Sequence, residues 1–125
     1  MLFRSYWNPV VLDSTALVPC HVSFQLYTRV ESKTNKRLLS GHLYQRSMDM
    51  FLGSPWNIAS YSLLIYILAK RHNMIPDELI ISTGDTHIYK NHIEQVREQL
   101  SRLCRPFPRV ELSDEIKTKE WSEIT

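Results

Sequence analysis

The chain has 125 residues, 43% of them hydrophobic and 22% charged, with a formal net charge of +2 at pH 7. This composition is typical of one globular domain and excludes a disordered chain. The charge is too small to indicate a nucleic-acid partner. The two cysteines, Cys20 and Cys104, are too few for a disulfide framework and suit a reducing compartment. The longest apolar run, near 61–69, is too short to cross a bilayer. We therefore expect a cytoplasmic domain with no membrane partner.

Two strands are predicted in the first half of the chain. From His21 to Val30 the side chains alternate between two faces. The polar run 31–36 predicts a hairpin loop, and a second alternating strand follows from Arg37 to Arg46. In the first strand, Val22, Phe24, Leu26 and Thr28 share one face, and His21, Ser23, Gln25, Tyr27 and Arg29 share the other.

A long helix is predicted after the second strand. Ser54 has the side chain of an N-cap and Pro55 suits the first helical position, so the helix is expected to run from Pro55 to about Arg71. Apolar residues cover most of its circumference, which predicts burial on all sides. The expected fold class is α+β, with a mixed, twisted β-sheet packed on this long buried helix. The apolar residues are Ile58, Leu63, Leu64, Ile65, Ile67 and Leu68.

The second half of the chain predicts shorter elements. Residues 78–82 form a short apolar run typical of a strand, and Gly84 predicts a turn after it. Asn91 is expected to cap a second helix, with Glu94 completing a capping box. Residues 109–112 predict a final strand.

Cys20 is the first candidate for chemistry, because a cysteine thiolate is a strong nucleophile when a cation or donor stabilises it. The alternative is a buried structural cysteine. Arg46 and Ser47 combine a guanidinium fork with a hydroxyl at a strand end, which suits a phosphate. The alternatives there are a surface salt bridge and a turn.

Asn57, in the first turn of the helix, offers one acceptor and one donor, which complement the carbonyl and N–H of a uracil edge. Its alternative is an amide bonded to local backbone. His87 and Tyr89 are two residues apart, so in an extended segment both can bond one sugar hydroxyl; the alternative is a surface loop. The histidines lack metal-ligand spacing, and we expect no metal.

Several strings of residues, taken in order, resemble thymidylate synthase. The resemblance runs from about Ser5 to Val110, and it is specific because independent strings match in sequence. They are Trp7-Asn8-Pro9, Pro19-Cys20-His21, Phe24-Gln25-Leu26-Tyr27, Tyr44-Gln45-Arg46-Ser47, Asp49, Phe51-Leu52-Gly53, Pro55, Asn57-Ile58-Ala59-Ser60-Tyr61, Gly84-Asp85-Thr86-His87-Ile88-Tyr89, Asn91-His92 and Arg105-Pro106-Phe107-Pro108.

The resemblance implies a role for each matching residue in binding deoxyuridylate (dUMP). Cys20 matches the nucleophile that adds to C6 of the pyrimidine. Arg46 and Ser47 match phosphate ligands, and Asn57 matches the residue that reads the uracil edge. The other matches are His87 and Tyr89 on the ribose hydroxyl, Asp49 between pyrimidine and folate, His21 and Gln45 in supporting positions, and Leu52, Gly53 and Trp56 where the folate packs.

The family reaction is the reductive methylation of dUMP to thymidylate. The resemblance implies 5,10-methylenetetrahydrofolate as the co-substrate that supplies both carbon and hydride. It also implies a homodimer formed through the sheet face that carries His21, Gln25 and Tyr27, or through the opposite face. Neither nucleic acid nor a metal is required.

A family subunit is more than twice as long as this chain. Residues 1–125 are therefore expected to form a single partial domain that lacks the N-terminal half and the C-terminal closing segment, and that is inactive alone. Three alternatives stay open. The chain is part of a working thymidylate synthase, or a truncated product with at most weak nucleotide binding or a dimerisation role, or part of a deoxycytidylate hydroxymethylase. Asn57 argues against the third, because the sister enzyme resembles this family with aspartate there.

Overall fold

A computed structural model describes residues 2–123 of the chain, and Met1, Ile124 and Thr125 fall outside the described part. Four strands form one sheet in the order β1–β2–β3–β4. Strand β2 pairs antiparallel with both β1 and β3, whereas β3 and β4 run parallel, so the sheet is mixed, as expected. The strands are β1 (Leu2–Ser5), β2 (His21–Val30), β3 (Arg37–Asp49) and β4 (Ile75–His87).

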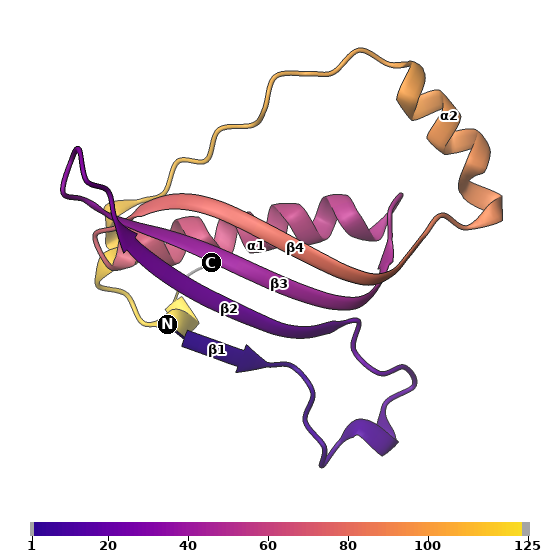
Figure 1. Ribbon diagram of the computed structural model, residues 1–125, viewed down its shortest axis with the longest axis horizontal. Coiled ribbons are helices and arrows are strands. Elements are labelled where there is room, and N and C mark those ends of the chain that lie inside the picture. Colours follow the sequence, from indigo (N-terminus) through magenta and orange to yellow (C-terminus); the bar gives the residue numbers. More distant parts are fainter. Residues whose placement is uncertain (1, 124–125) are drawn as a thin grey trace.

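One long helix, α1 (Gly53–Arg71), joins β3 to β4 and lies along one face of the sheet (Figure 1). This confirms the α+β class. The other helical segments are short: α2 (Ile93–Ser101), and the 3-10 turns η1 (Leu12–Ser14), η2 (Lys90–His92), η3 (Asp114–Lys117) and η4 (Trp121–Glu123).

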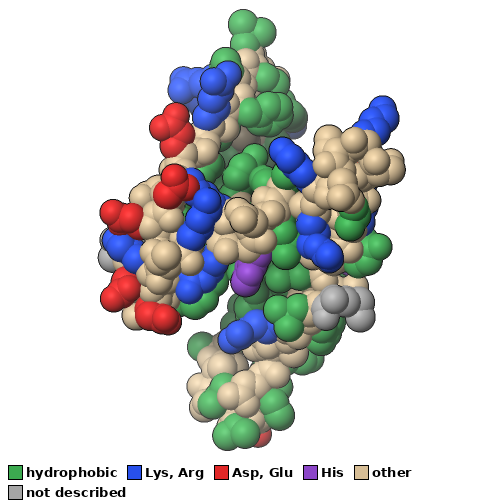
Figure 2. Space-filling view, turned by 90° about the vertical axis from the view of Figure 1, so that its left-hand side faces the viewer, with side chains coloured by type: hydrophobic (Ala, Val, Ile, Leu, Met, Phe, Trp, Pro, Cys, Tyr) green, Lys and Arg blue, Asp and Glu red, His purple; other side chains and the backbone are tan. Residues whose placement is uncertain are grey.

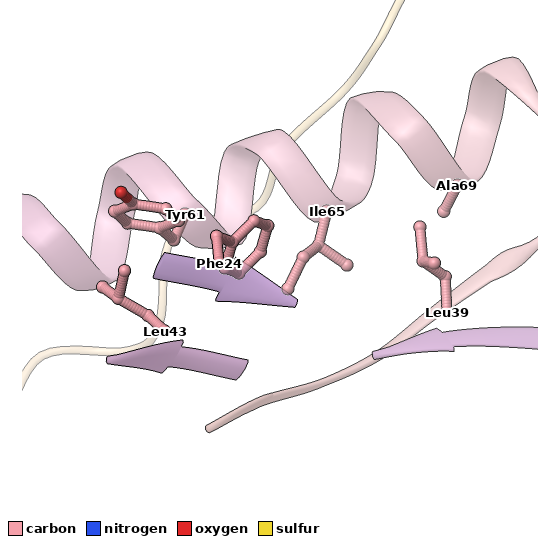
Figure 3. Packing of buried hydrophobic residues seen from close by; sticks show 6 residues of the cluster. All are labelled: Phe24, Leu39, Leu43, Tyr61, Ile65 and Ala69. Atoms are coloured by element: carbon pink, nitrogen blue, oxygen red, sulfur yellow. The ribbon is translucent and has the colours of Figure 1, made fainter. Parts of the chain in front are cut away.

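The core lies between α1 and strands β2 and β3. Tyr61, Ile65 and Ala69 recur every four residues, so they share one face of the helix. They pack on alternate residues of the sheet, as Figure 3 shows. Burying a large apolar side chain contributes about 1.5–3 kcal/mol, so each large apolar side chain buried in this seam between helix and sheet stabilises the fold. On the sheet side the seam is formed by Phe24, Leu39 and Leu43.

The expectation that α1 is buried on all sides is wrong for the described residues. Its outward face stays open: Ile58, Leu63 and Tyr66 are 49%, 41% and 43% exposed. Apolar residues do cover most of the circumference, but the sheet buries only one face, and residues 107–111 line a hollow beside the outward face.

The start of α1 also differs from the prediction. The helix begins at Gly53 with Leu52 as its N-cap, and no side chain caps it. Asp49 acts just before that point, because its Oδ1 accepts the N–H groups of Phe51 and Leu52 at 3.0 and 3.4 Å. The helix thus begins two residues before the predicted start at Pro55, and Ser54 is a buried residue of its first turn.

Strands β3 and β4 are longer than predicted, and the predicted turn at Gly84 is wrong. Gly84 lies inside β4, and a Cβ atom there would sit 2.7 Å from the carbonyl oxygen of Arg46 on β3. The glycine is thus explained by the close approach of two strands rather than by a turn. This pairing carries β3 to Asp49 and β4 to His87, which face each other in register.

A β-bulge changes the direction of His21. The register of β2 and β3 shifts between His21 and Ser23. His21 was predicted on the face of Gln25 and Tyr27, but its Nδ1 lies 2.9 Å from the hydroxyl of Tyr61 on α1. Because the bulge inserts a residue, the side-chain alternation of the strand breaks at this point.

The C-terminal third differs from the prediction in two elements. A 3-10 turn precedes α2, which has His92 as its N-cap without a side-chain bond, so neither the Asn91 cap nor the capping box forms. Glu94 instead pairs with Arg97 at 2.6 Å, and residues 109–112 are not a strand. Strand β1, which no pattern indicated, pairs with β2.

Charged side chains tie the last turns to the end of α1. Lys70 contacts Asp114 at 3.1 Å, and the Arg71 guanidinium lies over the Trp121 ring at 5.3 Å. Acidic and basic groups lie intermixed along one side of that end (Figure 2). This view faces the end of the sheet remote from Cys20.

We expect Gly84→Ala to destabilise the fold by about 1–3 kcal/mol, because the new methyl group must push apart two hydrogen-bonded strands. The measurement is the free energy of unfolding in urea. Gly53→Ala is the matched control, since its Cβ would meet Asp49 at an ordinary 3.5 Å. Equal stability of the two variants would contradict the argument.

Candidate functional site

The topology brings the predicted site residues to one end of the sheet. Strand β2 begins where the antiparallel β3 ends, and the parallel β4 ends beside it. Helix α1 starts from the same edge (Figure 1). Residues from four separate stretches of sequence are therefore neighbours in the fold: Cys20 and His21, Gln45 to Asp49, Leu52 to Asn57, and His87 with Tyr89.

Cys20 lies beside Arg46. The backbone N–H of Arg46 donates to the carbonyl oxygen of Cys20 at 2.9 Å. The Arg46 guanidinium reaches the same loop, where Nη2 donates to the carbonyl oxygen of Val18 at 2.5 Å. Trp7 holds the loop from the other side, because its indole N–H donates to the carbonyl oxygen of Pro19 at 3.1 Å. The half-buried thiol is thus fixed at the end of β3.

Two buried polar atoms at this end have no hydrogen-bond partner among residues 2–123. They are Arg46 Nε, a donor, and Gln45 Oε1, an acceptor on a side chain that is 1% exposed. Unpaired buried polar groups cost about 1–3 kcal/mol each, so their presence marks a site that a ligand or water completes.

Asp49, Gly53 and Asn57 form a second group at the start of α1. A Cβ on Gly53 would meet Asp49 Cβ at 3.5 Å and Asn57 Nδ2 at 3.8 Å. The absence of a side chain at Gly53 therefore leaves space between the carboxylate and the amide. Leu52 and Trp56 beside them are 52% and 74% exposed.

His87 is the last residue of β4, and Tyr89 follows two positions later. Their rings meet edge to face with centroids 4.9 Å apart, and His87 Nδ1 lies 3.1 Å from Asp85 Oδ2. His87 also faces Asp49 in the strand register. The ring of His92 packs on Tyr89 and Phe51, and its Nδ1 is buried without a partner in the described residues.

The structure adds residues that no sequence pattern singled out. Tyr61 bonds His21, Asp85 orients His87, and Val18 accepts from Arg46. The Tyr61 contact depends on the bulge, which alternation cannot predict. The contact between Asp85 and His87 can be predicted from the sequence, because residues two apart on a strand share a face.

Several hollows of the described surface, of about 230 to 680 Å³, are lined by other residues. The largest of these lies between the outward face of α1 and residues 107–111. Convergence of Cys20, Arg46, Ser47, Asn57, His87 and Tyr89 on one enclosed pocket stays a prediction.

Two kinds of feature are absent from residues 2–123. No group of three or more His, Cys, Asp or Glu side chains there is arranged to hold a metal ion. None of the helices in that part combines the length and apolarity that crossing a membrane requires.

A mixed sheet with a long crossover helix defines an α+β domain, and Arg46 at the sheet end holds the loop that carries Cys20. The thymidylate synthase family profile matches residues 1–125. The chain belongs to the thymidylate synthase family, whose enzymes are methyltransferases of nucleotide biosynthesis.

Two curated relatives show the extent of the match. The chain is 46% identical over 114 residues to a thymidylate synthase of Mycoplasma pneumoniae, covering 91% of this chain and 38% of that protein. It is 44% identical over 127 residues to the enzyme of Saccharomyces cerevisiae, covering 99% and 42%. The chain thus spans about two fifths of the length of these relatives.

We expect the stability of the chain to fall above about pH 10 through Tyr61. Burial raises the pKa of Tyr61 above its ordinary value of 10.0, and the neighbouring Tyr6 adds to the rise. The unfolded hydroxyl ionises first, so stability is fully present below pH 10 and is lost as the pH rises above it. The extra slope is at most about 1.4 kcal/mol per pH unit. Urea unfolding of wild type and Tyr61→Phe across this range measures it, and parallel curves would refute it.

Proposed function

We propose that this chain carries the nucleophile and the nucleotide-binding surface of a thymidylate synthase. The observation that supports this most is the placement of Cys20 against Arg46 at the sheet end where the other predicted ligands gather. In this proposal dUMP and 5,10-methylenetetrahydrofolate are the substrates, and the protein works in the cytoplasm.

In this proposal Arg46 holds the phosphate of the nucleotide close to Cys20. Its Nε is a buried donor without a protein partner in the described residues, so one N–H is available for a phosphate oxygen. Ser47, the next residue on β3, adds a hydroxyl donor. Holding the phosphate there places C6 of the pyrimidine near Cys20.

Asn57 reads the base and His87 with Tyr89 holds the sugar. The Asn57 amide offers an acceptor to the uracil N–H and a donor to its carbonyl, a pattern that cytosine does not match. Asp85 fixes the His87 ring from one side and Tyr89 packs on it from the other. This support orients both groups toward a ribose hydroxyl.

The folate fits the exposed apolar surface at the start of α1. Leu52 and Trp56 offer a flat contact for the pterin ring, and Gly53 leaves it room beside Asp49. When bound, the folate supplies the one-carbon unit and the hydride. The residues of this chain position it next to the nucleotide and shield one side from water.

We expect the purified 125-residue chain to bind dUMP weakly and to make thymidylate at least about 10⁴-fold more slowly than the intact yeast relative, because positioned acid–base groups alone contribute about 10²–10⁴-fold. Calorimetric titration with dUMP and an absorbance assay of dihydrofolate formation measure the two quantities.

Arg46→Ala should weaken dUMP binding about tenfold or more, while Arg29→Ala, remote on β2, should not. Turnover near that of the yeast enzyme would overturn the expectation, and full dUMP affinity in Arg46→Ala would remove the phosphate role.

We further propose a homodimer formed by the sheet face opposite α1. Tyr27 is 54% exposed there and Ile80 50%, and the face holds a hollow of about 310 Å³ lined in part by Arg29, Ser40 and His42. Exposed apolar groups mixed with polar ones are typical of a surface that pairs with its own copy.

We expect Tyr27→Glu to shift the chain from dimer toward monomer, because the interface would bury an unpaired charge. Tyr66→Glu is the control, since Tyr66 is 43% exposed on the outward face of α1. Sedimentation velocity over a concentration series distinguishes the two. A wild-type chain that stays monomeric, or equal effects of both variants, would count against the sheet-face dimer.

A further inference from the structure

We infer that Tyr61 is a positioning residue that fixes the ring and the proton of His21, so that the neutral imidazole carries its hydrogen on Nε2 and presents a donor beside Cys20. Its link to catalysis rests on the proposed function; the tautomer itself does not.

The bulge at the start of β2 turns His21 into an aromatic cluster. The rings of Tyr61 and Tyr6 lie 5.3 and 6.1 Å from it, both edge-on. Tyr61 is 6% exposed and belongs to the core. Tyr6 is attached to β2 through its N–H, which donates to Val22 at 3.0 Å. The plane of the imidazole is therefore set by packing.

One hydrogen bond links the cluster to the ring. Tyr61 Oη and His21 Nδ1 are 2.9 Å apart. Burial raises the pKa of Tyr61, so its hydroxyl keeps its proton at any pH at which the enzyme works. The ring of Tyr6 packs edge-on against that of Tyr61, with centroids 6.4 Å apart, and so helps to hold the hydroxyl against Nδ1.

Gln45, which lies opposite His21 on β3, indicates which partner donates in the hydrogen bond between Tyr61 and His21. His21 pairs in register with Gln45, whose buried Oε1 is an acceptor without a partner in the described residues. A hydrogen on Nε2 supplies a donor on the side of that acceptor, directly or through water or ligand. A hydrogen on Nδ1 would leave Nε2 as an acceptor that cannot bond the Gln45 acceptor. If Tyr61 donates to Nδ1, the hydrogen lies on Nε2, and both Nδ1 and Gln45 Oε1 can be satisfied.

The neutral ring then presents Nε2–H as a donor on the residue that follows Cys20 in the chain. No other side chain among residues 2–123 hydrogen-bonds His21, so Nε2 is available to a carbonyl oxygen of the nucleotide or to water bound to it. Tyr61 touches no substrate in this scheme. It acts only through the imidazole, as the second partner of a catalytic histidine does.

The test is a two-bond ¹H–¹⁵N correlation spectrum of the labelled chain at about pH 9, where imidazoles are ordinarily neutral, with His21 assigned from a His21→Gln variant. We expect an Nδ1 without hydrogen and a protonated Nε2. In Tyr61→Phe, which keeps the ring but loses the hydroxyl, the two ¹⁵N shifts should move toward each other as the tautomers mix. Tyr6→Phe, the matched control, should leave the Nε2–H form dominant.

A protonated Nδ1 in the wild-type chain would overturn the inference, and this result needs no variant to fold. An unchanged tautomer in a folded Tyr61→Phe chain would also overturn it. Titration with dUMP separates this inference from the proposed function: the expected tautomer with no dUMP binding would count against the function and leave the tautomer in place.

Discussion

The contact between one face of α1 and strands β2 and β3 determines the position of everything else in the described chain. Tyr61 and Ile65 of the helix pack on Phe24 and Leu43 of the strands. Because β3 runs into α1 and α1 returns into β4, this contact also makes β3 and β4 parallel neighbours. Cys20, Asp49, Asn57 and His87 come together because the strand ends that carry them are held in that order.

Tyr61 serves both the core and the candidate site. Its ring is part of the apolar cluster, and its hydroxyl reaches His21, the residue after Cys20. The imidazole is thus attached to the most rigid part of the fold rather than to a loop. Precision of about an ångström at a reacting group requires support of this kind.

Much of this arrangement was predictable from the sequence. Strand β2 follows a simple alternation, and its predicted bounds are confirmed. The class of fold and the existence of α1 followed from patterns of period two and 3.6. The order of strings such as Tyr44-Gln45-Arg46-Ser47 indicated the family, which the profile match confirms.

The differences have a common physical origin in contacts distant in sequence. Gly84 was predicted as a turn because glycine favours turns, yet the backbone of Arg46 determines its place in β4. His21 was assigned to the wrong face because a bulge adds one residue that period-two counting does not contain. Asp49 displaced Ser54 as the group that receives N–H donors before the helix. Secondary-structure propensity reflects a residue and its neighbours in sequence. It does not predict contacts with a strand about forty residues away in the chain.

The open outward face of α1 affects how this polypeptide behaves before any ligand is present. Ile58, Leu63 and Tyr66 form an apolar row on the side of the helix away from the sheet. Such a surface is recognised by chaperones that hold exposed hydrophobic segments, and it favours aggregation at micromolar concentration. The yield of soluble chain in a cell will therefore depend on how long that row stays uncovered during synthesis, which is a question of rates rather than of equilibrium stability.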